Sequence, residues 1–183
     1  EVGLKLATDG EFRRSWWHFD FFRGLKGVEP ITTATGIQFH GVETKHEAIK
    51  ISGKVEFVGH PQIEHFKFLK AHCRVVPKMC IPAPSTFHFR QGRALVSKDV
   101  YPDIDQFFAD VGVAWRKAIR AFYDAGCRYL QLDDTAWAMM CDPNEREQSK
   151  TRGDDPDKLP AVYAAVTRGA LEGKPADMAI TMH

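Results

Sequence analysis

Short apolar runs that stop abruptly on ionisable side chains constrain the fold of this 183-residue chain more than any other feature. Three such runs end at Asp9–Glu11, at Asp133–Asp134 and at His183. A strand buried on both faces of a parallel sheet reads as an apolar run, and in β/α folds the chemistry lies just beyond the carboxyl ends of such strands. The pattern therefore predicts that two acidic groups and a histidine converge on one rim.

Helical patterns separate these runs. They cover Phe12–Phe22, Pro61–His72, Pro102–Ala125 and Pro156–Leu171. The third pattern is the clearest, because its apolar residues recur at i, i+3, i+4 and i+7 and Gly126 follows it. Besides the run that begins at Leu4, apolar strand patterns cover Arg74–Ile81, Cys127–Asp133 and Asp177–His183.

Three segments depart from this alternation of strand and helix. Between Gly36 and Gly59 apolar and polar residues alternate, which predicts antiparallel strands that leave the main fold. The proline-rich segment Pro82–Thr86 reads as a loop, and the polar segment Asp142–Asp155 reads as a long exposed loop of the kind that often serves as a lid.

Strands that alternate with helices indicate a parallel sheet with helices outside it. The last predicted strand ends at the last residue of the sequence. We therefore expect an α/β fold that is an incomplete portion of a (β/α)8 TIM barrel, which typically needs about 250 residues. This expectation places about four parallel strands and a β-hairpin excursion in one partial domain, residues 1–183, truncated at both ends.

Composition narrows the possible partners and compartments. The formal net charge is +1, and no basic face is apparent, which argues against nucleic acid as a partner. No apolar run approaches the roughly 20 residues that span a bilayer, and no secretory signal is visible, so we expect no membrane partner and a cytoplasmic protein. The cysteines are expected to be free and mostly buried thiols, because no CxxC spacing occurs among Cys73, Cys80, Cys127 and Cys141.

The acidic residues at the strand ends are the first candidates for binding or catalysis. Asp133 and Asp134 are adjacent, so their side chains point to opposite faces and only one can enter a barrel mouth. Asp133 could bind a substrate ammonium group, ligate a metal or act as a base, whereas Asp134 could instead cap the next element. Glu11 could form a salt-bridged turn with the arginines that follow it or face a substrate.

His183 and several aromatic residues have more than one possible role. A lone histidine after an apolar strand is a weak metal signal, because zinc sites need three or four ligands and no second ligand lies nearby in the sequence. Cys80 on the neighbouring predicted strand could be a partner or a core residue. Aromatic residues just after strand ends could stack on a planar ligand or pack the loops: Trp16, Trp17, Phe87, Phe89 and Trp137.

Four motifs together resemble a known family. Thr8–Arg14, Lys78–Thr86, Gln131–Trp137 and Ile180–His183 are similar, in that order, to motifs of the C-terminal catalytic barrel of cobalamin-independent methionine synthase, particularly its shorter single-barrel relatives. The resemblance runs nearly end to end. It implies a (β/α)8 barrel in which zinc binds a thiol substrate, homocysteine in the synthases, so that the thiolate attacks a methyl group.

The resemblance also assigns roles to individual residues. It implies that Glu11 and Asp133 bind the amino group of the substrate and that His183 is a zinc ligand, while it assigns no further catalytic side chain. The remaining zinc ligands of the family, two cysteines and a glutamate, fall after His183. On this basis the chain covers roughly the second to fifth strands of the barrel.

One position departs from the family pattern and leaves the methyl donor open. Met139 stands where the family has a glutamate linked to folate binding, and a thioether cannot accept hydrogen bonds from a pterin as a carboxylate does. The sequence therefore favours zinc-dependent methyl transfer to a thiol with an undetermined donor. Other possibilities are alkyl transfer to another thiol, as in the related epoxide to coenzyme M transferases, a zinc-free barrel like uroporphyrinogen decarboxylase, or an inert fragment or binding module.

Overall fold

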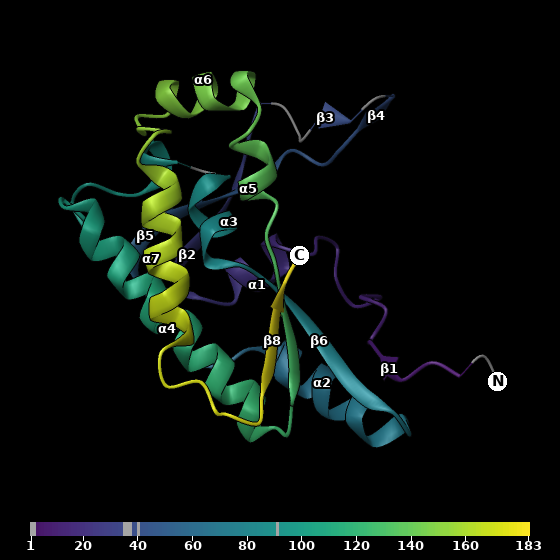
Figure 1. The fold of residues 1–183 in the computed structure, drawn as a ribbon. Coiled ribbons are helices and arrows are strands. Elements are labelled where there is room, and N and C mark those ends of the chain that lie inside the picture. The colour runs from purple at the N-terminus through teal and green to yellow at the C-terminus, as the bar shows by residue number, and fades with distance from the viewer. Residues whose placement is uncertain (1–2, 35–37, 40, 91) are drawn as a thin grey trace.

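The main sheet of the protein is parallel. The computed structural model describes residues 3–34, 38–39, 41–90 and 92–183. Its main sheet contains β1 (Leu6–Ala7), β6 (Val76–Pro82), β7 (Tyr129–Asp133) and β8 (Ala179–Met182), hydrogen-bonded in that order (Figure 1). The parallel pairing of these strands confirms the predicted parallel sheet. Because spatial order follows chain order, each strand joins the sheet beside the one before it, as in a β/α architecture.

Three helices pack against one face of this sheet. These are α2 (Pro61–His72), α4 (Ile104–Asp124) and α7 (Leu159–Leu171) (Figure 1). The ends of α2 match the prediction because Pro61 occupies its first turn and the His60 side chain caps it. Asp103 caps α4 by accepting a hydrogen bond from the Asp105 amide, and the helix ends just before Gly126.

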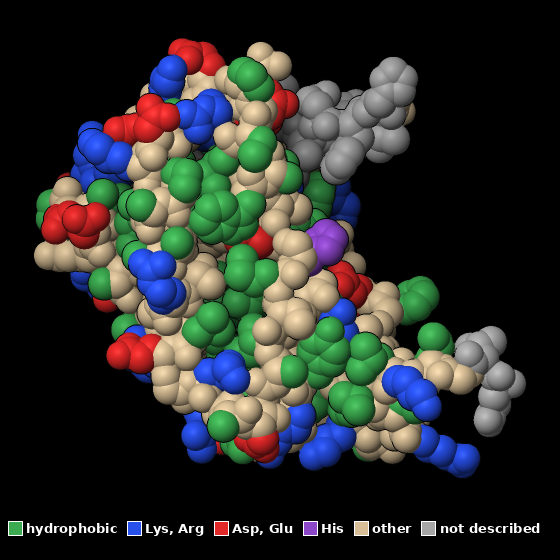
Figure 2. Space-filling view, in the orientation of Figure 1, with side chains coloured by type: hydrophobic (Ala, Val, Ile, Leu, Met, Phe, Trp, Pro, Cys, Tyr) green, Lys and Arg blue, Asp and Glu red, His purple; other side chains and the backbone are tan. Residues whose placement is uncertain are grey.

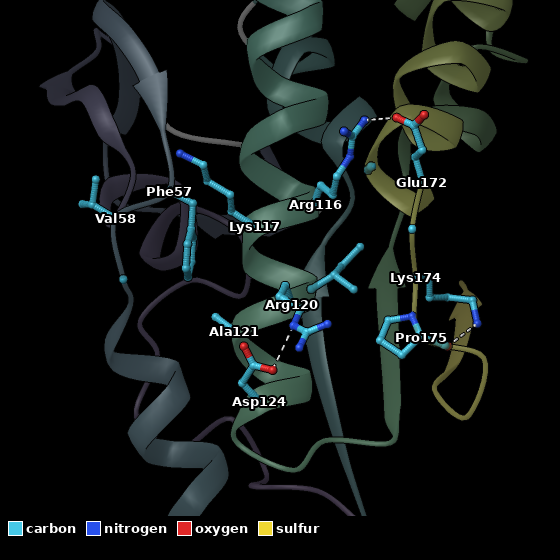
Figure 3. Close-up of a pocket in the computed structure, with 14 residues that line it drawn as sticks. Phe57, Val58, Arg116, Lys117, Arg120, Ala121, Asp124, Glu172, Lys174 and Pro175 are labelled. Carbon is cyan, nitrogen blue, oxygen red and sulfur yellow. Dashed lines mark hydrogen bonds and ion pairs between the residues drawn. The ribbon is translucent and has the colours of Figure 1, made fainter.

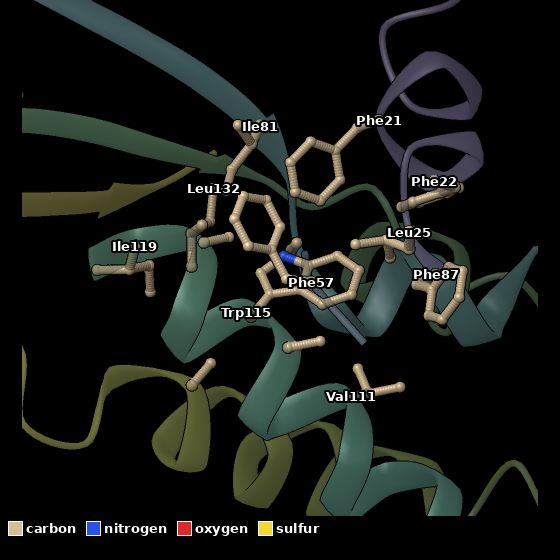
Figure 4. Close-up of a cluster of buried hydrophobic side chains, with 14 of the residues drawn as sticks. Phe21, Phe22, Leu25, Phe57, Ile81, Phe87, Val111, Trp115, Ile119 and Leu132 are labelled. Carbon is tan, nitrogen blue, oxygen red and sulfur yellow. The ribbon is translucent and has the colours of Figure 1, made fainter. Parts of the chain in front are cut away.

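A single hydrophobic cluster joins the sheet to the helices. Trp115 and Ile119 of α4 pack beneath Ile81 of β6 and Leu132 of β7, and Phe21 of α1 (Phe19–Arg23) closes the cluster (Figure 4). Each of these five side chains is at most 2% exposed. Burial of this much apolar surface fixes the position of the sheet on the helices.

The two faces of the sheet differ in character. Leu130 and Leu132 are fully buried against the helices, whereas Gln131 and Asp133, which alternate with them, are only half-buried. Hydrophobic side chains are exposed in the region of β1 and β6 (Figure 2), where Leu6 is 40% exposed. Within the part of the chain that the structure describes, the face opposite the helices is therefore open, and it carries the polar residues.

An antiparallel excursion follows α1. β2 (Lys26–Thr32) pairs with β5 (Glu47–Glu56), and a short hairpin joins β3 (Gln38–Phe39) to β4 (Val42–Glu43). The antiparallel strands predicted between Gly36 and Gly59 are thus partly confirmed. The prediction missed β2, and Gly36 and Ile37 lie outside the described residues.

Three local predictions were wrong. The helix expected over Phe12–Phe22 is a series of turns followed only by α1, because the His18 side chain caps Phe19 and starts the helix there. The expected loop at Pro82–Thr86 contains the start of α3 (Pro84–Phe89), and the expected loop at Asp142–Asp155 contains α6 (Pro143–Thr151).

The remaining elements are short. They are α5 (Ala136–Met139) and one 3-10 helix at Arg93–Leu95. The predicted helix Pro156–Leu171 is α7 with a later start. Among the described residues, every helix is too short or too polar to cross a membrane.

Candidate functional site

Three potential ligand residues meet near the carboxyl ends of β1, β6 and β7 in the main sheet: Glu11, Cys80 and Asp133. Each offers one potential ligand atom, and these atoms all lie within 4.8 Å of one another. Glu11 lies in the turn after β1, Cys80 near the end of β6 and Asp133 at the end of β7. The structure thus brings together the two carboxylates that the sequence singled out, and all three side chains are half-buried.

The turn that carries Glu11 has an unusual backbone. Glu11 has φ +58°, in the left-handed region that side chains other than glycine rarely occupy. The turn is held by the Glu11 amide, which donates to Asp9 Oδ1 at 3.2 Å, and by the Arg14 amide, which donates to the Glu11 carbonyl at 3.0 Å. A strained residue held in this way is common at binding and catalytic sites, because the surrounding contacts must compensate for it.

Arg14 ties this turn to the neighbouring strand. Its guanidinium donates to both carboxylate oxygens of Asp9 at 3.0 and 3.2 Å and to the Cys80 carbonyl at 3.2 Å. It also lies 3.5 Å from Glu11 Oε1, and only 3% of the Arg14 side chain is exposed. From the sequence, Arg14 is evident only as a residue of the Thr8–Arg14 motif and of a possible local salt bridge, because its contact with Cys80 joins segments that are distant in sequence.

Burial raises the pKa of two of the three grouped side chains, Glu11 and Cys80. Burial, opposed by the Arg14 guanidinium, raises the pKa of Glu11. Burial and then the Asp133 carboxylate raise the pKa of Cys80 to about 11, so the thiol stays protonated at neutral pH. The group therefore presents two carboxylates beside a neutral thiol, and two carboxylates placed in this way can hold a cation.

Asp134 has a structural role. Its carboxylate, in a residue only 5% exposed, accepts hydrogen bonds from the Ser85 hydroxyl, from Thr86 Oγ1 at 3.2 Å and from the Ala136 amide at 3.0 Å. These contacts fix the start of α5 to α3. The capping role considered for Asp134 is therefore confirmed, and the residue points away from Asp133 as strand geometry requires.

His183 lies on the same rim but outside the carboxylate group. Its amide donates to the Leu132 carbonyl at 3.1 Å, and the pairing of Met182 with Leu132 places His183 beside Asp133 in the register. Its side chain is exposed. Among the described residues, the one group of three or more potential metal ligands is Glu11, Cys80 and Asp133, and His183 is not part of it.

The aromatic candidates divide into core and rim residues. Phe87 and Phe89 are 1% and 4% exposed and pack in the interior, so they cannot stack on a ligand. Trp17 stacks on His18 with ring centroids 4.6 Å apart, and Trp16 Nε1 donates to Glu47 at 2.7 Å. Trp137 remains half-buried with an indole N–H that has no partner.

The cysteines differ from the expectation in one respect. All four are free thiols, as predicted, but only Cys127 is fully buried. Cys73 and Cys141 lie just beyond helix ends and are partly exposed and exposed, whereas Cys80 is partly exposed because it alternates with buried Met79 and Ile81 on β6. The expectation that they are mostly buried was therefore wrong.

A separate groove lies toward the amino ends of the strands, away from the carboxylate group. It has a volume of about 620 Å³ and runs between the second half of α4 and the segment after α7 (Figure 3). Its arginines are neutralised by neighbours, since Arg116 pairs with Glu172 and Arg120 pairs with Asp124 at 2.9 Å. The groove is also lined by Lys174, whose ammonium group donates to the carbonyls of Pro175 and Met178 at 3.1 and 2.7 Å.

Comparisons with known proteins place the chain among longer relatives. No protein-family model matches it. Two uncharacterized proteins of Bacillus subtilis (strain 168), YxjH and YxjG, are each 47% identical to it over 184 and 185 residues, which is 100% of this chain and 48% of either relative. The chain thus spans about half the length of the curated relatives it matches.

Two solved structures are also similar. A crystal structure from Listeria monocytogenes, of a candidate vitamin B12-independent methionine synthase, matches with a TM-score of 0.77 and 42% identity over 100% of this chain and 49% of that one. A B12-independent methionine synthase from Shewanella sp. W3-18-1, solved with selenomethionine, matches with a TM-score of 0.69 and 17% identity over 99% of this chain and 46% of that one. The second likeness is evidence for the fold alone.

Proposed function

We propose that this chain is part of a (β/α)8 barrel enzyme that transfers a methyl group to a thiol, with homocysteine as acceptor and methionine as product. The observation that carries the proposal is the meeting of Glu11 and Asp133 at one rim, from two different strands. The similarity to the Listeria monocytogenes structure supports the same reaction class. The half-length match and the exposed strand edges support a barrel to which residues 1–183 contribute one portion.

In this proposal the two carboxylates bind the substrate ammonium group. Two anions that flank one cation form charge-assisted hydrogen bonds, which are among the strongest in proteins. Arg14 holds the Glu11 turn in place through Asp9 and the Cys80 carbonyl. The amino acid is thereby oriented with its thiol directed along the rim, toward His183.

Zinc is the metal that this function requires, and His183 is the residue here that would hold it. The exposed imidazole fits one position of a zinc site, while the paired carboxylates of Glu11 and Asp133 match an ammonium ion. The other ligands would come from outside residues 1–183. A zinc ion supplies Lewis acidity that lowers the pKa of a bound thiol.

Substrate affinity tests the proposal directly. In the complete natural protein, we expect Glu11→Gln and Asp133→Asn each to weaken L-homocysteine binding by about tenfold or more, since each removes a charged partner of the ammonium group. The corresponding thiol without the amino group should bind weakly to the wild-type protein and equally to both variants. Titration calorimetry measures both ligands.

The matched control is Glu64→Gln, which neutralises an exposed carboxylate on α2. It should leave both affinities unchanged. Wild-type binding that is as tight for the thiol without an amino group as for homocysteine would refute the assigned acceptor and favour a different thiol, such as coenzyme M.

A further inference from the structure

A hydrogen-bonded chain of side chains reaches Asp133 across two strands. Gln131 Nε2 donates to Asp133 Oδ1 at 2.6 Å, and Lys78 Nζ donates to Gln131 Oε1 at 2.5 Å. Gln131 and Asp133 alternate with buried leucines on β7, and Lys78 lies on β6. All three side chains therefore belong to the open, polar face of the sheet.

The lysine determines which way the glutamine amide points. An ammonium group can only donate hydrogen bonds, so the amide must present its oxygen to Lys78. Its NH2 group then faces Asp133. The reversed amide would place Gln131 Oε1 against the Asp133 carboxylate, where two acceptors repel each other. Lys78 is itself held near the Tyr129 ring, with Nζ 5.2 Å from the centroid.

We propose that Lys78 and Gln131 are positioning residues that orient the Asp133 carboxylate toward the substrate ammonium group; this inference rests on the proposed function. One carboxylate oxygen of Asp133 is occupied by Gln131. In the part of the chain that the structure describes, no side chain donates to the other oxygen, which remains available to a ligand. The chain thus fixes the rotation of the carboxylate beside Glu11 and Cys80.

Charge and positioning predict opposite effects when Lys78 is removed. The charged or ionisable groups around the site are Asp9, Glu11, Arg14, Lys78, Cys80 and Asp133. Lys78 is a cation near the site of a cationic ligand, so its loss should by charge alone strengthen ammonium binding. If Lys78 instead acts through the amide of Gln131, its loss should weaken binding.

The experiment measures L-homocysteine affinity by calorimetry in the complete natural protein. We expect Lys78→Met and Gln131→Leu each to weaken binding about tenfold, because a hydrogen bond to a charged group is lost or misdirected. Lys78→Arg should stay within about threefold of wild type, since a guanidinium also only donates. Lys67→Met on α2 removes an exposed lysine and serves as the matched control.

A second ligand separates positioning from general damage to the fold. The thiol without an amino group does not engage Asp133, so its weak affinity should be the same in wild type, Lys78→Met and Gln131→Leu. Side-chain amide resonances of Gln131 give a readout without ligand, and they should shift in Lys78→Met but not in Lys67→Met.

Different results would overturn the inference and the proposed function. Tighter or unchanged homocysteine binding in Lys78→Met, with a clear loss in Asp133→Asn, would reject the positioning role and leave the proposed function standing. Unchanged binding in both Asp133→Asn and Glu11→Gln would reject the proposed function. An unshifted Gln131 amide in Lys78→Met would reject the positioning inference whatever the ligand does.

Discussion

Arg14 joins three parts of the candidate site through one buried guanidinium. It contacts Asp9, Glu11 and the carbonyl of Cys80, and the Arg14 and Asp9 side chains are 3% and 4% exposed. A buried ion pair adds little net stability compared with apolar packing, but removal of one partner leaves an uncompensated charge. Arg14 therefore matters both for the site and for the fold.

Loss of Arg14 should destabilise the protein strongly. We expect Arg14→Met to lower the free energy of unfolding by roughly 3–5 kcal/mol, because Asp9 would remain buried without its partner. Urea denaturation measures this change. Arg120→Met is the control, since it breaks an exposed ion pair with Asp124 and should cost at most about 1 kcal/mol. Similar small losses in both variants would contradict the role given to Arg14.

Protonation of Glu11 should weaken substrate binding at low pH. Burial raises the pKa of this carboxyl above its usual 4.5, despite Arg14 and with help from Asp133 and Asp9. The folded protein therefore favours the protonated form, and a protonated Glu11 cannot hold an ammonium group. Homocysteine affinity should fall as the pH drops through this raised pKa, at milder acidity than an ordinary glutamate would require.

The pH dependence has its own control. Glu11→Gln should bind homocysteine weakly at every pH, and its affinity should not fall further at low pH in a calorimetric titration series. A fall at low pH that persists in Glu11→Gln would assign it to another group.

The free energy of unfolding should change with pH in the opposite direction. The protonated form of Glu11 favours folding, so its stabilising contribution is present at low pH and is lost as the pH rises through the raised pKa.

At the scale of the elements, α4 supports the site from below through Trp115. The indole is fully buried, and its Nε1 donates to the Pro82 carbonyl at 2.8 Å. Pro82 is the last residue of β6 and pairs in register with Asp133. The hydrogen bond from α4 therefore holds the end of β6 in position beside Asp133.

Trp115→Phe should destabilise the protein by about 1–3 kcal/mol, because it leaves the Pro82 carbonyl unpaired and a small cavity beside it. Guanidinium denaturation followed by circular dichroism measures this loss. Trp137→Phe is the matched control, since it removes an indole N–H that has no partner and should cost less. Equal losses would show that the hydrogen bond to Pro82 contributes nothing.

In the molecule as a whole, both edge strands of the main sheet are exposed, and His183 lies at one of these edges. Leu6 of β1 and Met182 of β8 are 40% and 46% exposed at the two edges. His183 follows β8, and among the described residues it belongs to no group of three or more potential metal ligands. These observations agree with the proposed function, in which further residues complete the sheet and the zinc site.

Zinc content should therefore depend on chain length. We expect the 183-residue chain to bind no stoichiometric zinc and to lack activity, and the complete natural protein to bind one equivalent. His183→Ala in the complete protein should release most of that zinc, as measured by metal analysis after dialysis. Retention of the full equivalent in His183→Ala would remove His183 from the metal site.

Local patterns in the sequence predicted the strands of the main sheet and the helices α2 and α4. The apolar runs ending at Asp133 and His183, and the caps and periodicity of α2 and α4, are local signals that the tertiary structure preserves. Where local signals competed, prediction failed. The polar composition of Asp142–Asp155 concealed α6, whose start depends on a capping bond from the Asn144 amide to Asp142.

Only the tertiary structure decided what surrounds the two carboxylates. Glu11 and Asp133 were identified from their places at strand ends, but the contacts of Arg14 with Cys80 and of Lys78 with Gln131 join segments far apart in sequence. Such contacts follow from strand order and register, which no local pattern encodes. The sequence could name the two carboxylates as candidates, while the packing of the strands determined which side chains hold them in place.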